Sequence, residues 1–335
     1  MEQENHKTEL VDQDEQDGGQ KIAEESAPKS RSDNGILWAS GIVAVGLMLS
    51  TVTYVFIMKS SGEKEVVGGS PVASQNLTTA SVVALQEEVA PSEGVTLPIT
   101  WGNLGQQLTA AGVIDEVQFK ALYAQRGGLP PDMLQMLDGS NNGQIKMTPQ
   151  NAGIILNMLW ALGLGQNSAV LIAGPMVTNG QAKPSQFAST GGWTLAVGNA
   201  MDHYAKHNFF TLTPAQEQLV ESVAKNIYRP CCGNSTYFPD CNHGMAMLGL
   251  LELMASQGAT ADQMYQTALT VNSYWFPDTY LTIAKYLQNK GVAWNAVKPE
   301  EILSATYSSA QGYQQILSQT APVQNNQSGG NGCGA

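Results

Sequence analysis

One stretch near the N-terminus constrains the organisation of this 335-residue chain more strongly than any other feature. Residues 36–58 are 23 consecutive positions without Asp, Glu, Lys or Arg. A helix rises about 1.5 Å per residue, so a helix of this length spans the roughly 30 Å hydrocarbon layer of a membrane. Trp38 and Tyr54 lie near its two ends, where amphipathic rings favour the membrane interface. We therefore predict a single transmembrane helix at residues 36–58.

Two other interpretations of residues 36–58 fit less well. A cleaved signal peptide has a shorter apolar region and a short basic leader, whereas this stretch follows an acidic leader of 35 residues. A buried core helix of this length rarely lacks charge altogether. Three basic side chains lie shortly before residues 36–58 and two lie shortly after them. The 55 residues that follow Lys64 contain no Lys or Arg. Since basic residues are retained on the cytoplasmic side, we expect a single-pass protein of the cell membrane with a cytoplasmic N-terminus and an extracytoplasmic main domain.

Changes in composition divide the rest of the chain. Residues 1–35 carry ten acidic and four basic side chains, half of the formal charge of −12, and are expected to form a disordered acidic tail. Residues 59–96 are expected to be a flexible linker and residues 321–335 a flexible Gly-rich tail. Residues 97–320 then form one folded domain. The acidic balance excludes nucleic acid as a partner, because such binding depends on Lys and Arg that displace counterions from phosphates.

The domain at residues 97–320 is predicted to be all-α, with about seven to nine helices. Alternating apolar and polar residues, the pattern typical of strands, are scarce, whereas helix start signals recur. Three residue pairs have the spacing of a capping box, in which a side chain satisfies a free backbone N–H at the start of a helix. These pairs are Asp115 with Gln118, Thr213 with Gln216, and Thr260 with Gln263.

The cysteines and histidines provide the strongest functional signal. Six of the eight in the chain lie within residues 203–243. Thiolates and imidazoles are the side chains that bind transition metals best, so we predict a metal site here, for zinc or for copper(I). Three methionines that follow the cluster also suit copper, although Met at this spacing is more commonly core filling. The predicted ligands are His203, His207, Cys231, Cys232, Cys241 and His243.

Spacing predicts how these residues are presented. His203 and His207 are four residues apart, which on a helix puts both rings on one face, although the central Glu of a metalloprotease motif is missing. A helix that begins at Pro214 and ends at Pro230 would place two cysteines in the following loop. Asp240 is expected to cap the next helix, with Cys241 in its first turn. A thiol at that position is biased toward the thiolate, so Cys241 is the cysteine with the highest expected reactivity.

Two further hypotheses remain beside metal binding for sensing, storage or delivery. In the first, the protein is a thiol–disulfide oxidoreductase in which Cys241 is the catalytic nucleophile, Cys231 or Cys232 resolves, and Cys333 acts as a relay. In the second, a disulfide between Cys232 and Cys241 staples the loop of a structural or interaction domain, which an extracytoplasmic location permits. The chain contains no phosphate loop, nucleophile elbow or zinc-protease motif that would name a reaction.

A weaker motif lies at residues 138–149, which resemble the calcium-binding loop of an EF-hand. Asp138, Ser140 and Asn142 occupy its first, third and fifth positions, but Pro149 stands where the closing bidentate Glu belongs. One carboxylate leaves too little charge for tight calcium binding. We therefore expect a hydrogen-bonded turn before the next helix instead of a calcium site.

Overall fold

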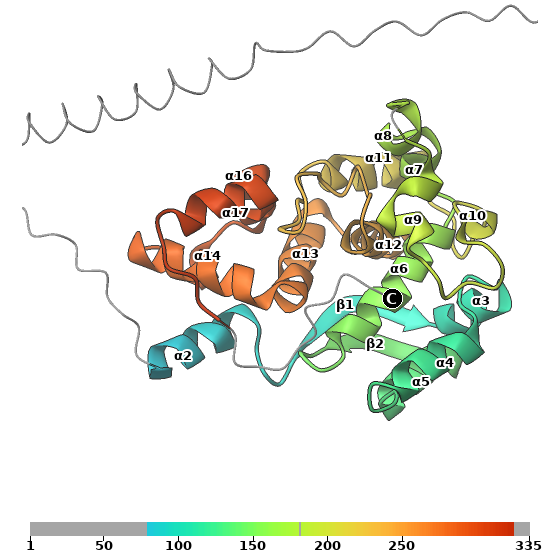
Figure 1. Cartoon of the computed structure of the whole chain (residues 1–335), viewed down its shortest axis with the longest axis horizontal. Helices are drawn as coiled ribbons and strands as arrows, with labels where there is room; N and C mark the ends of the chain where they lie inside the picture. The colour runs from blue at the N-terminus through green and yellow to red at the C-terminus, as the bar shows by residue number, and fades with distance from the viewer. Residues whose placement is uncertain (1–78, 181, 325–335) are drawn as a thin grey trace, which may run out of the picture. The chain divides into compact units, whose positions relative to one another are not determined.

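A computed structural model of the chain describes residues 79–180 and 182–324 (Figure 1). The predicted acidic tail, the predicted transmembrane helix at residues 36–58 and most of the predicted linker lie outside these residues. Cys333 and the predicted C-terminal tail from residue 325 onward also lie outside them. Among the helices of the described part, none combines the length and the apolar character that a membrane span requires.

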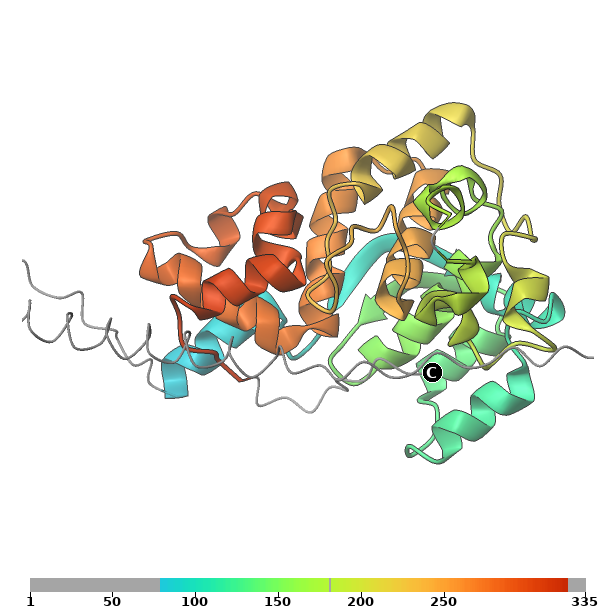
Figure 2. The ribbon, with the colours of Figure 1, turned by 45° about the horizontal axis from the view of Figure 1, so that its top comes forward.

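The described part is mainly helical, which confirms the helical character of the predicted domain, but its helices are shorter and more numerous than the predicted seven to nine. Many of them are single turns (Figure 2). The first third contains α2 (Thr79–Val89), β1 (Val95–Gly102), α3 (Leu104–Ala110), α4 (Glu116–Ala124), α5 (Pro131–Asp138) and β2 (Asn142–Met147). The middle contains α6 (Ala152–Gly165), α7 (Ala169–Ala173), α8 (Pro175–Thr178), α9 (Ala188–Gly191), α10 (Ala200–His203), α11 (Pro214–Ala224) and α12 (Asn242–Ser256). The last part contains α13 (Ala261–Trp275), α14 (Pro277–Asn289), α15 (Pro299–Leu303), α16 (Ala305–Ser308) and α17 (Ala310–Leu317), and short 3₁₀ turns lie at Pro184–Gln186 and Trp294–Ala296.

Strands β1 and β2 form an antiparallel pair that the sequence analysis did not predict. Their signal was the alternation of Leu97, Ile99 and Trp101, which are all buried in the core on one face of β1. Pro98 interrupts this pattern and has no N–H to donate, and the register of the pair shifts at this point in the strand. The paired residues are Val95 with Met147, Thr96 with Lys146, Thr100 with Gln144, and Gly102 with Asn142.

The segment that resembles a calcium-binding loop runs into strand β2. The carboxylate of Asp138 accepts a hydrogen bond from the Lys120 ammonium at 2.9 Å, and the Asn142 amide donates to a backbone carbonyl of β1 at 2.7 Å. The turn before α6 is hydrogen-bonded, since the Thr148 N–H donates to the Asn151 side chain at 2.8 Å. Asp138 and Asn142 therefore serve the fold through contacts to other protein groups.

Helices α6 and α12 form the centre of the core (Figure 1). Nearly every residue of both helices is buried, because neither has a polar face. Their backbones touch where Gly163 of α6 meets Gly249 of α12. A Cβ on Gly249 would lie 2.6 Å from the Gly163 nitrogen, and a Cβ on Gly163 would overlap the Met245 carbonyl oxygen. The two glycines are therefore required by the close approach of the helices.

Local helix signals agree with the structure at three positions. Asp115, Thr213 and Thr260 each cap a helix by accepting a hydrogen bond from the backbone N–H three residues further on, as predicted. The helix that begins at Pro214 was predicted to end at Pro230. This predicted end was wrong, because α11 ends at Ala224. Residues 227–236 instead form a short antiparallel turn with its own backbone hydrogen bonds.

Candidate metal centre

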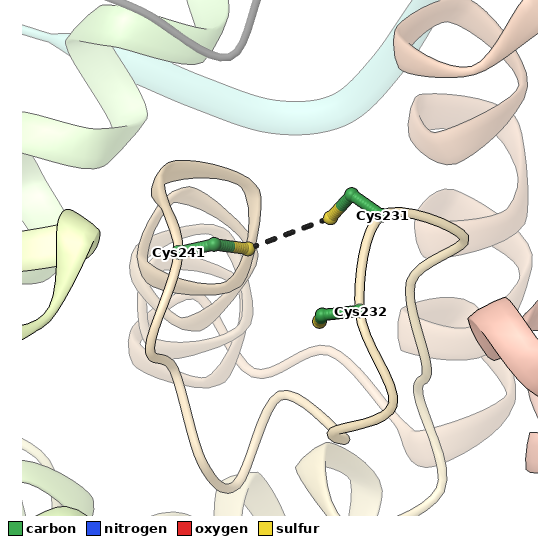
Figure 3. Close-up of side chains that lie close together, drawn as sticks. All are labelled: Cys231, Cys232 and Cys241. Carbon is green, nitrogen blue, oxygen red and sulfur yellow. Dashed lines mark hydrogen bonds between the residues drawn. The ribbon is translucent and has the colours of Figure 1, made fainter. Parts of the chain in front are cut away.

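Three cysteines from two segments meet at the start of α12 (Figure 3). Cys231 and Cys232 lie in the loop after α11, and Cys241 immediately precedes α12. Their three Sγ atoms all lie within 4.8 Å of one another, and the Sγ atoms of Cys231 and Cys241 are 3.6 Å apart. No other group of three or more His, Cys, Asp or Glu in the described residues has its ligand atoms gathered in this way.

The loop that carries the cysteines is held by Asp240. Its Oδ1 accepts a hydrogen bond from the Arg229 Nη2 at 2.7 Å, and its Oδ2 accepts one from the Asn234 amide at 2.7 Å. The backbone contributes as well, since the carbonyl of Cys232 accepts a hydrogen bond from Ala310 at 2.9 Å. Asp240 was predicted to cap α12, and this was wrong because both of its carboxylate oxygens bind within the loop.

Cys241 takes the capping position instead. Its Sγ accepts the backbone N–H of Gly244 at 3.4 Å, which places the sulfur at the positive end of the α12 dipole. Hydrogen bonds with Cys231 and Cys232 hold the pKa of Cys241 well below its usual range, and the charge of Arg229 and a hydrogen bond with the His243 ring lower it further. Hydrogen bonds with Cys232 and Cys241 raise the pKa of Cys231. A hydrogen bond with Cys231 lowers the pKa of Cys232, but a hydrogen bond with Cys241 and burial outweigh this effect, so the pKa of Cys232 is raised as well. The surroundings of Cys241 therefore favour its thiolate more than those of the other two cysteines favour theirs.

Arg229 is the charged residue of the site that the sequence analysis missed. Its side chain is fully buried, and its Nε and Nη1 have no hydrogen-bond partner in the described part of the chain. Burial lowers its pKa, but the three cysteines and Asp240 outweigh this effect and raise the pKa above the ordinary value. Gly244 permits this packing, since a Cβ there would lie 2.7 Å from the guanidinium carbon. Arg229 is the only Lys or Arg in residues 226–284, and it lies two positions before Cys231. This isolated charge beside the cysteines is the feature of the sequence from which its role in the site could have been predicted.

His203 and His207 lie together, but apart from the cysteine group. The prediction that one helix carries both was wrong: α10 ends at His203, and the chain turns at Ala205, whose φ is 53°. His207 then pairs with Gln166 in a short bridge. The Nδ1 of His203 and the Nε2 of His207 are 3.1 Å apart. The pKa of His207 is lowered, mainly because the ring is partly buried and also because His203 lies beside it.

His243 lies near the cysteines without joining their group of three. It is buried in the first turn of α12, and its ring packs against Phe276 at 4.4 Å and Trp275 at 5.7 Å between centroids. Its Nδ1 has no hydrogen-bond partner among the described residues. The structure thus gathers three of the six predicted ligands and separates the histidine pair from them.

The cysteine spacing suits a metal. Four ligands arranged tetrahedrally at about 2.3 Å, the usual Zn–S length, place neighbouring sulfurs about 3.8 Å apart. The Cys231 and Cys241 sulfurs, at 3.6 Å, are close to this value, and all three cysteines are free thiols. The chain matches no known protein-family model, no curated protein sequence and no solved structure at a significant level.

The lowered pKa of Cys241 predicts an unusual pH dependence of its reaction with iodoacetamide. An ordinary thiol has a pKa near 8.5, so its thiolate fraction falls about a hundredfold from about pH 8 to about pH 6. Because the pKa of Cys241 is held well below its usual range, we expect this cysteine to stay deprotonated between these pH values, and its alkylation rate in reduced, metal-free protein should change less than about threefold. Mass spectrometry of the cysteine peptides measures each rate separately. Cys231 and Cys232 serve as internal controls with the steep dependence, and the same steep dependence at Cys241 would contradict the prediction.

Proposed function

We propose that this protein binds a transition metal ion, zinc or copper(I), through Cys231, Cys232 and Cys241. The observation that carries the proposal is the convergence of three sulfurs within 4.8 Å around a cysteine whose thiolate is stabilised. Thiolates are the form of cysteine that binds metals, so Cys241 offers a ligand without first losing a proton at neutral pH. Cys231 is exposed and leaves the site open to an incoming ion.

The charge of Arg229 supports a thiolate site. Three thiolates around a divalent cation carry one net negative charge, and a buried guanidinium beside them compensates it. The unpartnered Nε and Nη1 of Arg229 then have anionic sulfurs nearby. Three protein ligands leave one position of a tetrahedral ion for water, for His243 or for an exchanging partner, which suits sensing, storage or delivery better than a closed structural site. We place this activity in an extracytoplasmic domain anchored to the cell membrane by residues 36–58.

Metal titration of the full-length protein tests the proposal. We expect one zinc or copper(I) ion per chain, measured by elemental analysis and by competition with a chromophoric chelator. Cys241→Ser should weaken binding at least a hundredfold, because it removes the thiolate that is ready to bind. The control variants Cys333→Ser and His203→Ala/His207→Ala should bind as the wild type does. Metal binding that is absent from the wild type, or unchanged in Cys241→Ser, would overturn the proposal.

A second candidate function is supported by the distance between Cys231 and Cys241. The Cys241 thiolate would attack a substrate disulfide and release one substrate thiolate. The Cys231 thiol, 3.6 Å away, would then lose its proton and attack the Cys241 sulfur, which releases the second substrate thiol and leaves a Cys231–Cys241 disulfide. This candidate predicts that metal-free protein catalyses reduction of insulin disulfides by dithiothreitol, and that Cys231→Ser stops turnover while Cys232→Ser does not.

A further inference from the structure

A cleft of about 750 Å³ opens at the N-terminal end of α6, and no cysteine lines it. Its walls come from the end of α4 and the loop that follows, from the first turns of α6, and from the end of α13. Its volume lies within the range of pockets that bind small organic molecules. Tyr123, Tyr274 and Trp275 line its walls with the small exposed parts of side chains that are otherwise buried.

The charge of the cleft is opposite to that of the chain. Arg126 is the single charged residue that lines it, in a protein with a formal charge of −12. The Arg126 guanidinium lies 5.8 Å from the ring centroid of Tyr123 and forms no ion pair with another described residue. Its charge is therefore left for a ligand.

The start of α6 adds to this positive character. Gly153 and Ile154, in the first turn of this 14-residue helix, belong to the wall of the cleft. The helix begins after Asn151, which makes no side-chain capping hydrogen bond, so the positive end of the helix dipole is not neutralised there by its cap residue. Gly153 also leaves room, since a Cβ built on it would meet no atom within 4 Å.

A buried polar group without a partner also lines the cleft. His243 is 4% exposed, and its Nδ1 makes no hydrogen bond to any described residue. Buried polar atoms are nearly always hydrogen-bonded in folded proteins, so an unsatisfied one in the wall of a cavity indicates a missing partner. His243 therefore adds a polar side chain to the wall of the cleft.

We propose that this cleft binds a small organic anion with a flat apolar body, of the aromatic carboxylate class. The anionic group lies near Arg126 and the start of α6, and the apolar body lies against the exposed parts of Tyr274 and Trp275. No cysteine lines this site, and His243 is the one residue that it shares with the candidate metal centre. Binding of the anion does not require a bound metal.

Calorimetric titration of the full-length protein with benzoate, 2-naphthoate and indole-3-acetate tests the proposal. We expect at least one of them to bind, and its uncharged amide analogue to bind at least tenfold more weakly. Gly153→Leu, which fills open space without a positive φ, should weaken binding at least tenfold. Arg126→Gln should remove the preference for the acid over the amide.

The matched control is Gly143→Leu, because Gly143 also has open space for a side chain but does not line this cleft. It should bind the anion as the wild type does, and the metal affinity of Gly153→Leu should also be unchanged, which separates failure of this site from failure of the metal site. The proposal is overturned if none of the three acids binds, if acid and amide bind equally, or if Gly153→Leu binds normally.

Discussion

Replacing Gly163 with alanine is expected to lower the free energy of unfolding by about 3 kcal/mol. The added methyl group would overlap the Met245 carbonyl oxygen on the facing helix α12. Neither group can move alone, because both belong to helix backbones in the most buried part of the domain. The two helices must therefore move apart, which weakens the packing of their buried side chains.

The control for this prediction lies on the same helix. Gly153→Ala adds the same methyl group to α6 where no atom lies within 4 Å, so stability should stay the same or rise by up to about 1 kcal/mol from reduced backbone entropy of the unfolded chain. Urea denaturation followed by circular dichroism measures both variants. Equal effects of the two substitutions would show that the close approach of α6 and α12 does not control stability.

Replacing Arg229 with methionine is expected to lower the free energy of unfolding by about 3 to 5 kcal/mol. Methionine fills a similar volume but removes the one cation that compensates Asp240 and the Cys241 thiolate. The carboxylate of Asp240, only 20% exposed, would then lack its charged partner. Metal affinity should fall as well, since the net negative charge of the thiolate site is no longer balanced.

Arg126→Met is the matched control, because Arg126 is exposed and forms no ion pair with another described residue. Its effect on stability should stay below about 0.5 kcal/mol. Arg229→Lys retains the charge but loses the planar guanidinium, so it should fall between the wild type and Arg229→Met. If Arg229→Met is as stable as the wild type, the buried ion pair is not required for the fold.

The capping-box predictions agreed with the structure, whereas the predicted helix end at Pro230, the predicted Asp240 cap and the predicted helical histidine pair did not. Thr213 and Thr260 cap their helices as predicted, because a capping box involves only residues three apart. His203 and His207 share no helix, because His207 forms backbone hydrogen bonds with residues 165–167 in place of a further helical turn. The β1–β2 pair was missed for the same reason, since the paired residues, from Gly102 with Asn142 to Val95 with Met147, lie 40 to 52 positions apart in the sequence.

The candidate site shows the same division. Clustering of Cys231, Cys232 and Cys241 within the sequence was enough to identify them together, since eleven residues limit how far apart they can lie. Arg229 was not identified, because a basic residue is normally exposed and nothing in the local sequence indicates burial. Its position depends on Gly244, which leaves space for the guanidinium at the start of α12.

The sequence by itself determined the helical character of the domain, the three capping positions, and the segment that contains the reactive cysteines. These features depend on side-chain chemistry and on contacts between residues close along the chain. Only the tertiary structure decided that Cys241 caps α12 in surroundings that favour its thiolate, that Arg229 is buried beside it, and that the histidine pair does not join the three cysteines. The physical reason is that burial and electrostatic neighbours are set by segments far apart in sequence, and these neighbours determine which thiol is ionised.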